Sequence, residues 1–421
     1  MQFLTLSLRG LLRNRRRSLA NLLAIALGFA AIALFAGYTH NIYRGLANQA
    51  IHGELLGHLT IAKRGMSREG KLYPERYLLS REEVLRITAL VKEERHVALV
   101  TPRLTLSGIV SNGRASTIFV AEGVDPTAAK ALQAGLLVWD NGDPKNEPTM
   151  IGTQALDATK PDTITLAQGL AELLRLKQGD RASLLSNTVS GQANAVDVVV
   201  GDRFKSGSAA TDDLYAFMPL ALARSLYDAE GRADRLTVLL EGADQTDAMR
   251  ADLVEKLKKA GYDLEIHTWK ELSEFYMQVR AMFNMIFGFI FGIVLVVVVM
   301  GIANSMSMTV VERTREIGTL RAIGLRRSGV VRLFVGEAAL LTMLGCVTGL
   351  LITVVVKYAI DAADISYVPP NQSGPVPLLV DLDVRHMLLT TLVMASVGAL
   401  AAWLPARRAA RQPIIDALGH V

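Results

Sequence analysis

The side chains of this chain best suited to recognition chemistry lie in a short segment between two apolar runs. The segment VERTREIGTLRAIGLRRSGVVRLF begins at Val311 and places arginines at roughly helical spacing among residues that favour helices. A guanidinium can donate two parallel hydrogen bonds to one carboxylate, so Arg313, Arg315 and Arg321 are suited to holding an acidic partner. A loop that served only membrane topology would need no such order. The pattern therefore predicts a structured segment that another molecule holds.

The sequence contains none of the catalytic or metal-binding motifs that we sought. Its histidines are scattered without HExxH, its serines lack GxSxG, and no GxxxxGK[ST] phosphate-binding loop occurs. The pair Asp212 and Asp213 is typical of a solvated loop, and Cys346 lies inside an apolar run as a small packing residue. We therefore predict no enzyme activity, cofactor or metal on this chain, and any ATP chemistry would have to belong to another polypeptide.

The composition indicates a membrane protein with a large polar domain. Hydrophobic residues make up 51% of the chain, charged residues 20%, and the mean hydropathy is +0.30. The net charge is only +5, and the arginines cluster beside apolar runs without interleaved aromatic residues. This distribution gives little support to nucleic-acid binding.

Four apolar runs are long enough to cross about 30 Å of hydrocarbon, which takes about twenty helical residues. Arginines flank the first run on its N-terminal side, separate the second from the third and follow the fourth, whereas aspartates precede the fourth. The positive-inside rule places both termini in the cytoplasm. We expect the membrane to be an inner, or plasma, membrane. The predicted segments are an amphipathic helix 1–17, spans 18–40, 281–311, 333–357 and 386–406, an extracytoplasmic domain 41–280, a cytoplasmic segment 312–332, an outer loop 358–385 and a tail 407–421.

The N-terminal run has an alternative interpretation as a cleavable signal peptide. The run is too long for a typical signal core, and no convincing small-x-small cleavage site follows it before His40, so we favour an uncleaved anchor. Before it, leucines and arginines occupy different faces of one predicted helix along the inner membrane surface.

The large extracytoplasmic segment has the mixed pattern of an α+β domain. Strands are predicted at 57–62, 104–110, 116–120, 181–185, 195–200 and 236–240, and helices at 81–94, 166–176, 220–227 and 245–260. Residues from Trp269 to Arg280 run into the second span without Gly or Pro, which predicts one helix of about forty residues, about 60 Å long. With Thr39–Ile51 continuing the first span, these helices would form a mechanical linkage; two ordinary tethers are the alternative.

The stretch from Val311 to Leu351, which contains the arginine-rich segment, resembles the signature of FtsX/MacB-type ABC transporter permeases. The tail PARRAARQPIIDAL, Pro405 to Leu418, resembles their C-terminal ends. Three stretches of the outer domain are similar to the lipoprotein-releasing LolC/LolE branch, whereas the tail is closer to the MacB branch. The three stretches are GHLTIAKRG from Gly57, GLAELLRLKQGDRASL from Gly169 and GDRFKSGSAATDD from Gly201.

The resemblance implies a permease that pairs with a second, identical or different, permease chain and with cytoplasmic ATPase subunits. It also implies contacts with membrane lipids and with a periplasmic acceptor or adaptor. Residues 312–325 would be the coupling helix that docks on the ATPase, and Glu337 would be the family's acidic position in the third span. The implied coupling residues are Glu312, Arg313, Arg315, Glu316, Gly318, Arg321, Gly324 and Glu337.

Bland alternatives exist for these assignments. The arginine-rich segment is also compatible with an ordinary positive-inside loop, and Glu337 with an interfacial carboxylate. The small-residue spacings Gly288-x-x-x-Gly292 and Gly345-x-x-x-Gly349 would permit close helix packing, although such spacing often arises by chance.

Three functions are compatible with the predicted architecture. The first is ATP-driven extraction of lipoprotein or lipid-like cargo from the outer leaflet, passed on by movement of the outer domain. The second is MacB-type efflux of a drug or peptide with an adaptor, and the third is FtsX-type mechanical activation of an envelope hydrolase. The sequence identifies no substrate-binding residue.

Overall fold

The computed structural model describes residues 15–70, 72–135, 156–157, 159–204, 212–367 and 376–418. The chain divides into two compact units. The helical unit comprises 1–42, 279–365 and 378–421, and the sheet unit comprises 43–278 and 366–377. The predicted N-terminal amphipathic helix lies almost entirely outside the described residues, as does most of the stretch from Gly201 that resembles LolC/LolE.

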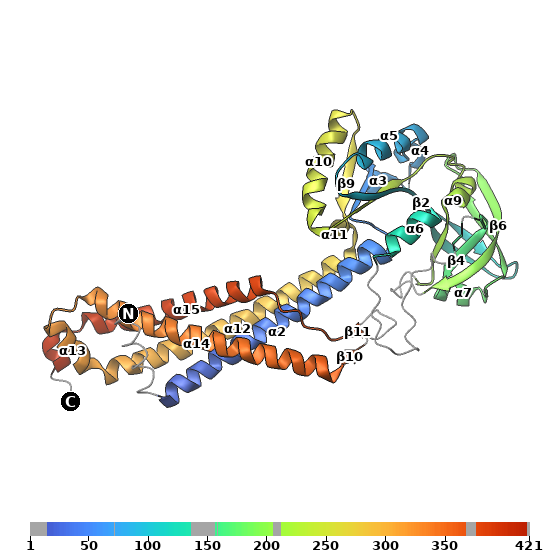
Figure 1. The fold of residues 1–421 in the computed structure, drawn as a ribbon. Coiled ribbons are helices and arrows are strands. Elements are labelled where there is room, and N and C mark those ends of the chain that lie inside the picture. Colours follow the sequence, from blue (N-terminus) through green and yellow to red (C-terminus); the bar gives the residue numbers. More distant parts are fainter. Residues whose placement is uncertain are drawn as a thin grey trace. The chain divides into compact units, whose positions relative to one another are not determined.

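The helical unit is built from four long helices, shown in Figure 1 with α14 and α15 side by side. All four are long and apolar enough to cross a membrane. They extend beyond the predicted spans, so that part of the expected cytoplasmic segment and of the tail is helical. The helices of this unit are α2 (Arg15–Asn48), α12 (Glu274–Glu312), α13 (Thr314–Ala322), α14 (Arg327–Ala363), α15 (Val384–Arg411) and α16 (Ile414–Leu418).

Small residues set the closest helix contacts in this unit. A methyl group at Gly345 of α14 would lie 2.5 Å from Ile25 Cγ2 of α2, and one at Gly349 would lie 2.7 Å from the Ala26 carbonyl oxygen. These glycines therefore let α2 and α14 approach each other. Gly288 and Gly292 of α12 pack differently, since no atom of the described residues lies within 4 Å of an added methyl group there.

The sheet unit confirms the predicted α+β class and contains two halves that share strand β2. Strands β2, β3, β7, β4, β6 and β5 pair in a closed circle and form a barrel. The first part of β2 instead pairs with β8, which continues to β1 and β9 as an open sheet. The strands are β1 (Leu59–Lys63), β2 (Val97–Ser111), β3 (Ser116–Val124), β4 (Thr163–Ala167), β5 (Arg181–Asn187), β6 (Ala193–Phe204), β7 (Tyr215–Pro219), β8 (Arg235–Leu240) and β9 (Leu264–Thr268), with a separate pair β10 (Ser366–Tyr367) and β11 (Val376–Pro377).

Each half has its own apolar core. Leu106, Phe119, Val198 and Leu226 are among the buried residues of the barrel, and α9 covers it. Leu59 and Val238 of the open sheet pack with buried side chains of α5 and α10. Figure 1 shows both helices beside this sheet. The helices of the unit are α3 (Met66–Glu69), α4 (Pro74–Tyr77), α5 (Arg81–Lys92), α6 (Pro126–Gln133), α7 (Gln168–Leu173), α9 (Leu220–Tyr227), α10 (Thr246–Lys259) and α11 (Trp269–Leu272), besides a π-helix, η1 (Gln49–Gly53), and a 3₁₀ turn, η2 (Ala243–Gln245).

Two predicted helices differ from the structure at their N-terminal ends. The helix expected at 166–176 begins as strand β4, because the run TITLA completes the barrel before α7 starts at Gln168. The helix expected to run from Trp269 through the second span is broken at Ser273, whose backbone is extended (φ −84°, ψ 91°). α12 starts only after this break, at Glu274, and is 39 residues long.

Candidate coupling site in the helical unit

The predicted coupling residues gather around α13, a nine-residue helix between α12 and α14. Thr314, Ile317 and Gly318 turn inward, and Ile317 packs with Val330 and Phe334 of α14. The residues of α13 thus follow a helical pattern with one buried face, as an amphipathic segment should. The opposite face is exposed and carries Arg315, Glu316, Thr319 and Leu320.

One buried ion pair joins the start of this segment to α14. Arg313 Nη1 lies 3.2 Å from Glu337 Oε2, and Arg313 Nε lies 3.7 Å from Glu316 Oε2. The side chain of Glu337 is only 3% exposed, so Arg313 compensates a carboxylate that has little access to solvent. Of the predicted arginines, Arg313 is therefore engaged within the chain.

The end of α13 is fixed by backbone geometry and by the C-terminal segment. Gly324 has φ +102°, and the next residue, Leu325, donates its N–H to the Leu320 carbonyl at 3.0 Å. This is the arrangement of a helix C-terminus that ends on a left-handed glycine. Arg321 donates to the carbonyl of Gln412, which lies two residues before the start of α16.

The structure separates the predicted residues into two groups. Arg313, Glu337 and Arg321 make contacts within the chain, Gly318 is buried, and Gly324 forms the turn after α13. Arg315, Glu312 and Glu316 have exposed side chains.

Sequence reasoning missed the contribution of α16. This helix contacts α13 and buries Ala417, whereas its Ile415 is 84% exposed. Ile323, in the connection after α13, is 77% exposed. The available sequence signal was the pair of adjacent isoleucines in PIIDAL. An isoleucine that faces outward from a solvated helix turn is uncommon, so the pair indicates a surface that another molecule covers. An exposed surface of α13 and α16, with apolar side chains and nearby arginines, has the composition of a docking surface.

No group of three or more His, Cys, Asp and Glu side chains that could hold a metal ion occurs among the residues that the structure describes.

Comparisons with known proteins agree with this architecture. Residues 18–256 match the MacB-like periplasmic core domain, and residues 288–414 match the FtsX-like permease C-terminal domain. The chain belongs to the FtsX/MacB-type permease family. This permease thus combines the family's periplasmic α+β domain with its apolar helices and is the transmembrane component of an ABC-type system.

Individual relatives are similar over part of their length. The chain is 28% identical to the macrolide export ATP-binding/permease protein MacB of Escherichia coli O157:H7 over 240 residues, which cover 56% of this chain and 30% of that protein. It is 35% identical to MacB of Shigella sonnei over 120 residues, covering 28% and 17%. The match therefore spans less than a third of either relative.

Two solved structures resemble the chain at low identity. The periplasmic region of MacB from Actinobacillus actinomycetemcomitans is 14% identical with a TM-score of 0.34, and covers 54% of this chain and 94% of its own. The extracellular domain of the noncanonic ABC-type transporter YknZ from Gram-positive bacteria is 13% identical with a TM-score of 0.32, and covers 50% and 100%.

Proposed function

We propose that this permease docks on a cytoplasmic ATPase through the exposed face of α13 and transmits the ATPase cycle to the sheet unit. The observation that carries the proposal is the division of labour within the coupling segment. Arg313 and Arg321 hold α13 against its own chain, whereas Arg315 extends from the exposed face. Arg315 is thus positioned to pair with a carboxylate of a partner.

We also propose that the chain pairs with a second permease chain. We place it in the inner membrane with both termini in the cytoplasm. ATP binding would draw two ATPases together and displace both copies of α13. ATP and Mg²⁺ would then be bound by the ATPase, and this chain would contribute no catalytic residue. The arginines on the N-terminal side of α14 and at the end of α15 support this orientation.

For the cargo, we propose lipoprotein or another lipid-like molecule taken from the outer leaflet. The support is the similarity of Gly57–Gly65 and Gly169–Leu184 to the LolC/LolE branch. The first stretch forms β1 with its flanking turns, and the second forms α7 and the start of β5. A second candidate is small-molecule export, which is favoured by the macrolide export of the MacB relatives.

The docking proposal is tested by reversing one charge. Arg315→Glu should strongly reduce co-purification of the ATPase from membranes, because it places a carboxylate opposite an acidic surface. Arg332→Glu makes the same charge change on an exposed position of α14, outside α13, and should retain most of the association. Equal association of wild type and Arg315→Glu, with normal membrane insertion, would contradict the proposal.

The cargo is tested by mass spectrometry of molecules that co-purify with the assembled complex. Acylated proteins or lipids enriched over their membrane abundance would support the first candidate. An adaptor protein, together with ATP-dependent export of a macrolide from cells, would support the second. Recovery of an envelope hydrolase without either would favour mechanical activation of that enzyme.

A further inference from the structure

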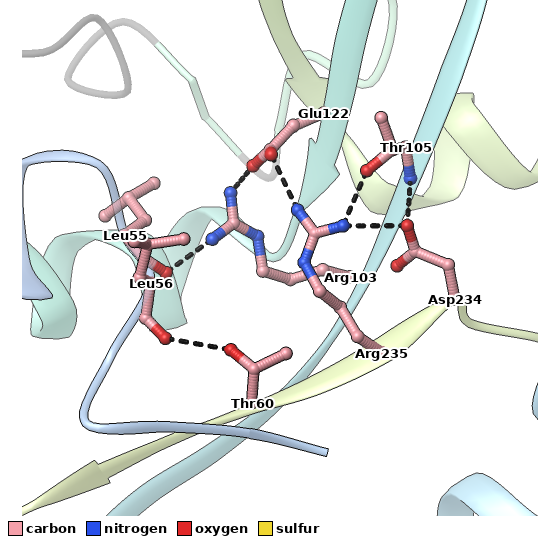
Figure 2. A network of polar contacts seen from close by, with 8 residues as sticks. All are labelled: Leu55, Leu56, Thr60, Arg103, Thr105, Glu122, Asp234 and Arg235. Carbon is pink, nitrogen blue, oxygen red and sulfur yellow. Dashed lines mark hydrogen bonds and ion pairs between the residues drawn. The ribbon is translucent and has the colours of Figure 1, made fainter. Parts of the chain in front are cut away.

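A buried network of charged side chains lies where the two halves of the sheet unit meet. Figure 2 shows Arg103 and Arg235 directed toward the same carboxylate, Glu122. Arg103 is 1% exposed and forms an ion pair with Glu122, while Arg235 Nη2 lies 2.6 Å from Glu122 Oε1. Arg235 also contacts Asp234 at 2.8 Å. Two guanidinium groups and two carboxylates thus balance their charges in an interior site.

The network connects elements that belong to different parts of the fold. Arg103 lies at the point where β2 stops pairing with β8 and, at Leu104, begins pairing with β3. Glu122 is on β3, in the barrel, and Arg235 is on β8, in the open sheet. Both arginines therefore hold the barrel through one carboxylate, and Arg235 does so from the open sheet.

Arg103 makes one further contact, to the segment that follows α2. Its Nη1 donates to the carbonyl of Leu55, as Figure 2 shows. Leu55 is fully buried and has φ +57°, a left-handed conformation that is unfavourable for a residue with a Cβ. The guanidinium thus satisfies a buried carbonyl at a backbone position that would otherwise be unfavourable.

The end of α2 is also tied down before it reaches Leu55. The π-helix η1 follows α2 directly, and its His52 Nδ1 donates to the Leu132 carbonyl at 2.7 Å. Asn48 donates to the Gly135 carbonyl at 2.8 Å, so both contacts are made at the C-terminal end of α6. The ring centroids of Tyr276 of α12 and Trp269 lie 4.8 Å apart, in the cluster that also buries Ile51. The segment from α2 to Leu55 therefore enters the unit in one defined path.

We infer that Arg103 is a positioning residue that ties the end of α2 to both the barrel and the open sheet, so that these three parts move together. Its planar fork reaches two acceptors on different elements, which a single-point donor cannot reproduce. The purpose of such a joint, passing movement of α2 to the barrel, rests on the proposed function. The joint itself is a property of the sheet unit and can be measured without an ATPase.

The test measures distances between spin labels in the purified full-length chain. Labels are placed on Cys346→Ser protein at exposed positions of the barrel (Ser190), the open-sheet half (Lys259) and the end of α2 (Arg44), each changed to cysteine. Pulsed electron–electron double resonance then gives the distance distributions between labels at positions 190 and 259 (Ser190–Lys259) and at positions 190 and 44 (Ser190–Arg44). We expect narrow distributions in the otherwise unchanged chain.

Substitutions in the network should broaden these distributions. Glu122→Gln removes the charge that both arginines share and should broaden Ser190–Lys259. Arg103→Met retains the side-chain length without donors and should broaden Ser190–Arg44 most. Arg103→Lys keeps the positive charge, so it should be expressed better than Arg103→Met. Its Ser190–Arg44 distribution should still be broader than in the unsubstituted labelled chain, because an ammonium lacks the planar fork of a guanidinium.

The control separates positioning from loss of stability. Val198→Ala opens a cavity in the barrel core, at a side chain that is 1% exposed, without touching the network. It should lower the melting temperature while leaving both distributions narrow. Unchanged distributions in Arg103→Met and Glu122→Gln, or equal broadening by Val198→Ala, would overturn the inference. Either result would leave ATPase docking through Arg315 untouched.

Discussion

The two units each bury an arginine–glutamate pair, but they build it differently. In the helical unit, Arg313 pairs with Glu337, and the other carboxylate neighbour of Arg313, Glu316, is 49% exposed. In the sheet unit, Glu122 is gripped by two guanidiniums, of which Arg103 also holds a backbone carbonyl. The first arrangement has one contact to exchange, whereas the second requires several contacts to break together. The Arg313–Glu337 pair should therefore be easier to break than the network of the sheet unit.

The largest effect is expected from removing the shared carboxylate of the sheet unit. Glu122→Ala leaves two guanidiniums with fewer acceptors in a buried site, which should cost about 3–5 kcal/mol. Hydrogen exchange of the β3 and β8 amides in the full-length protein would report this loss locally. Glu82→Ala removes an exposed pair with Arg86 (2.6 Å) and should change exchange little. Equal effects of the two substitutions would remove the distinction between the buried network and an ordinary surface pair.

A second expected difference between the units is acid sensitivity. His58 is buried in the sheet unit and accepts a hydrogen bond from the Leu240 N–H at 3.0 Å, and burial, with the nearby His52, lowers its pKa from 6.5 to about 4. The unfolded chain therefore binds the proton first as the pH falls. His58 should contribute up to about 3 kcal/mol of stability above pH 6.5 that is lost progressively between pH 6.5 and 4.

The measurement is the pH dependence of hydrogen exchange at β1 and β8. His58→Asn retains a hydrogen-bond acceptor but has no proton to gain, so its stability should depend less on pH in that range. An identical pH profile in wild type and His58→Asn would contradict the assignment. The burial of Arg103, with the charge of Arg235, lowers the pKa of Arg103 to about 9, so that residue stays protonated throughout the titration.

The single pair of the helical unit should have a smaller effect than the network. Arg313→Ala leaves the buried Glu337 carboxylate without this donor, at a cost of about 2 kcal/mol. The first turn of α13 should become more accessible to a protease in detergent-solubilised protein. Adding Glu337→Gln to Arg313→Ala should recover part of the loss, because a neutral amide is less costly to bury. No recovery would indicate that Arg313 acts through other contacts.

The sequence predicted the elements whose signals are local. Apolar length gave the four long helices, and arginine spacing gave α13. Strands such as β4 and β7 were not found, because TITLA and YAFMP are short and continue directly into helical patterns. Arg103 gave no signal at all. An arginine in a strand usually faces solvent, and its partners Glu122 and Arg235 come from other strands, so only the fold reveals that it is buried.

The smallest expected effect concerns the stability of the C-terminal end of α13 and is tested by comparing substitutions of two glycines. Gly324 and Gly336 both have open space where a methyl group would go, but only Gly324 has a positive φ (+102°), while Gly336 lies within α14. Gly324→Ala should therefore destabilise the end of α13 by about 1 kcal/mol. Gly336→Ala should be neutral or slightly stabilising, since alanine favours a helix over glycine. Hydrogen exchange of the Leu325 amide, which donates to Leu320, reports the difference directly. If Gly324→Ala left this exchange unchanged, the left-handed turn would not limit the position of α13, and the contact of Arg321 with Gln412 would remain as the restraint at that end of the helix.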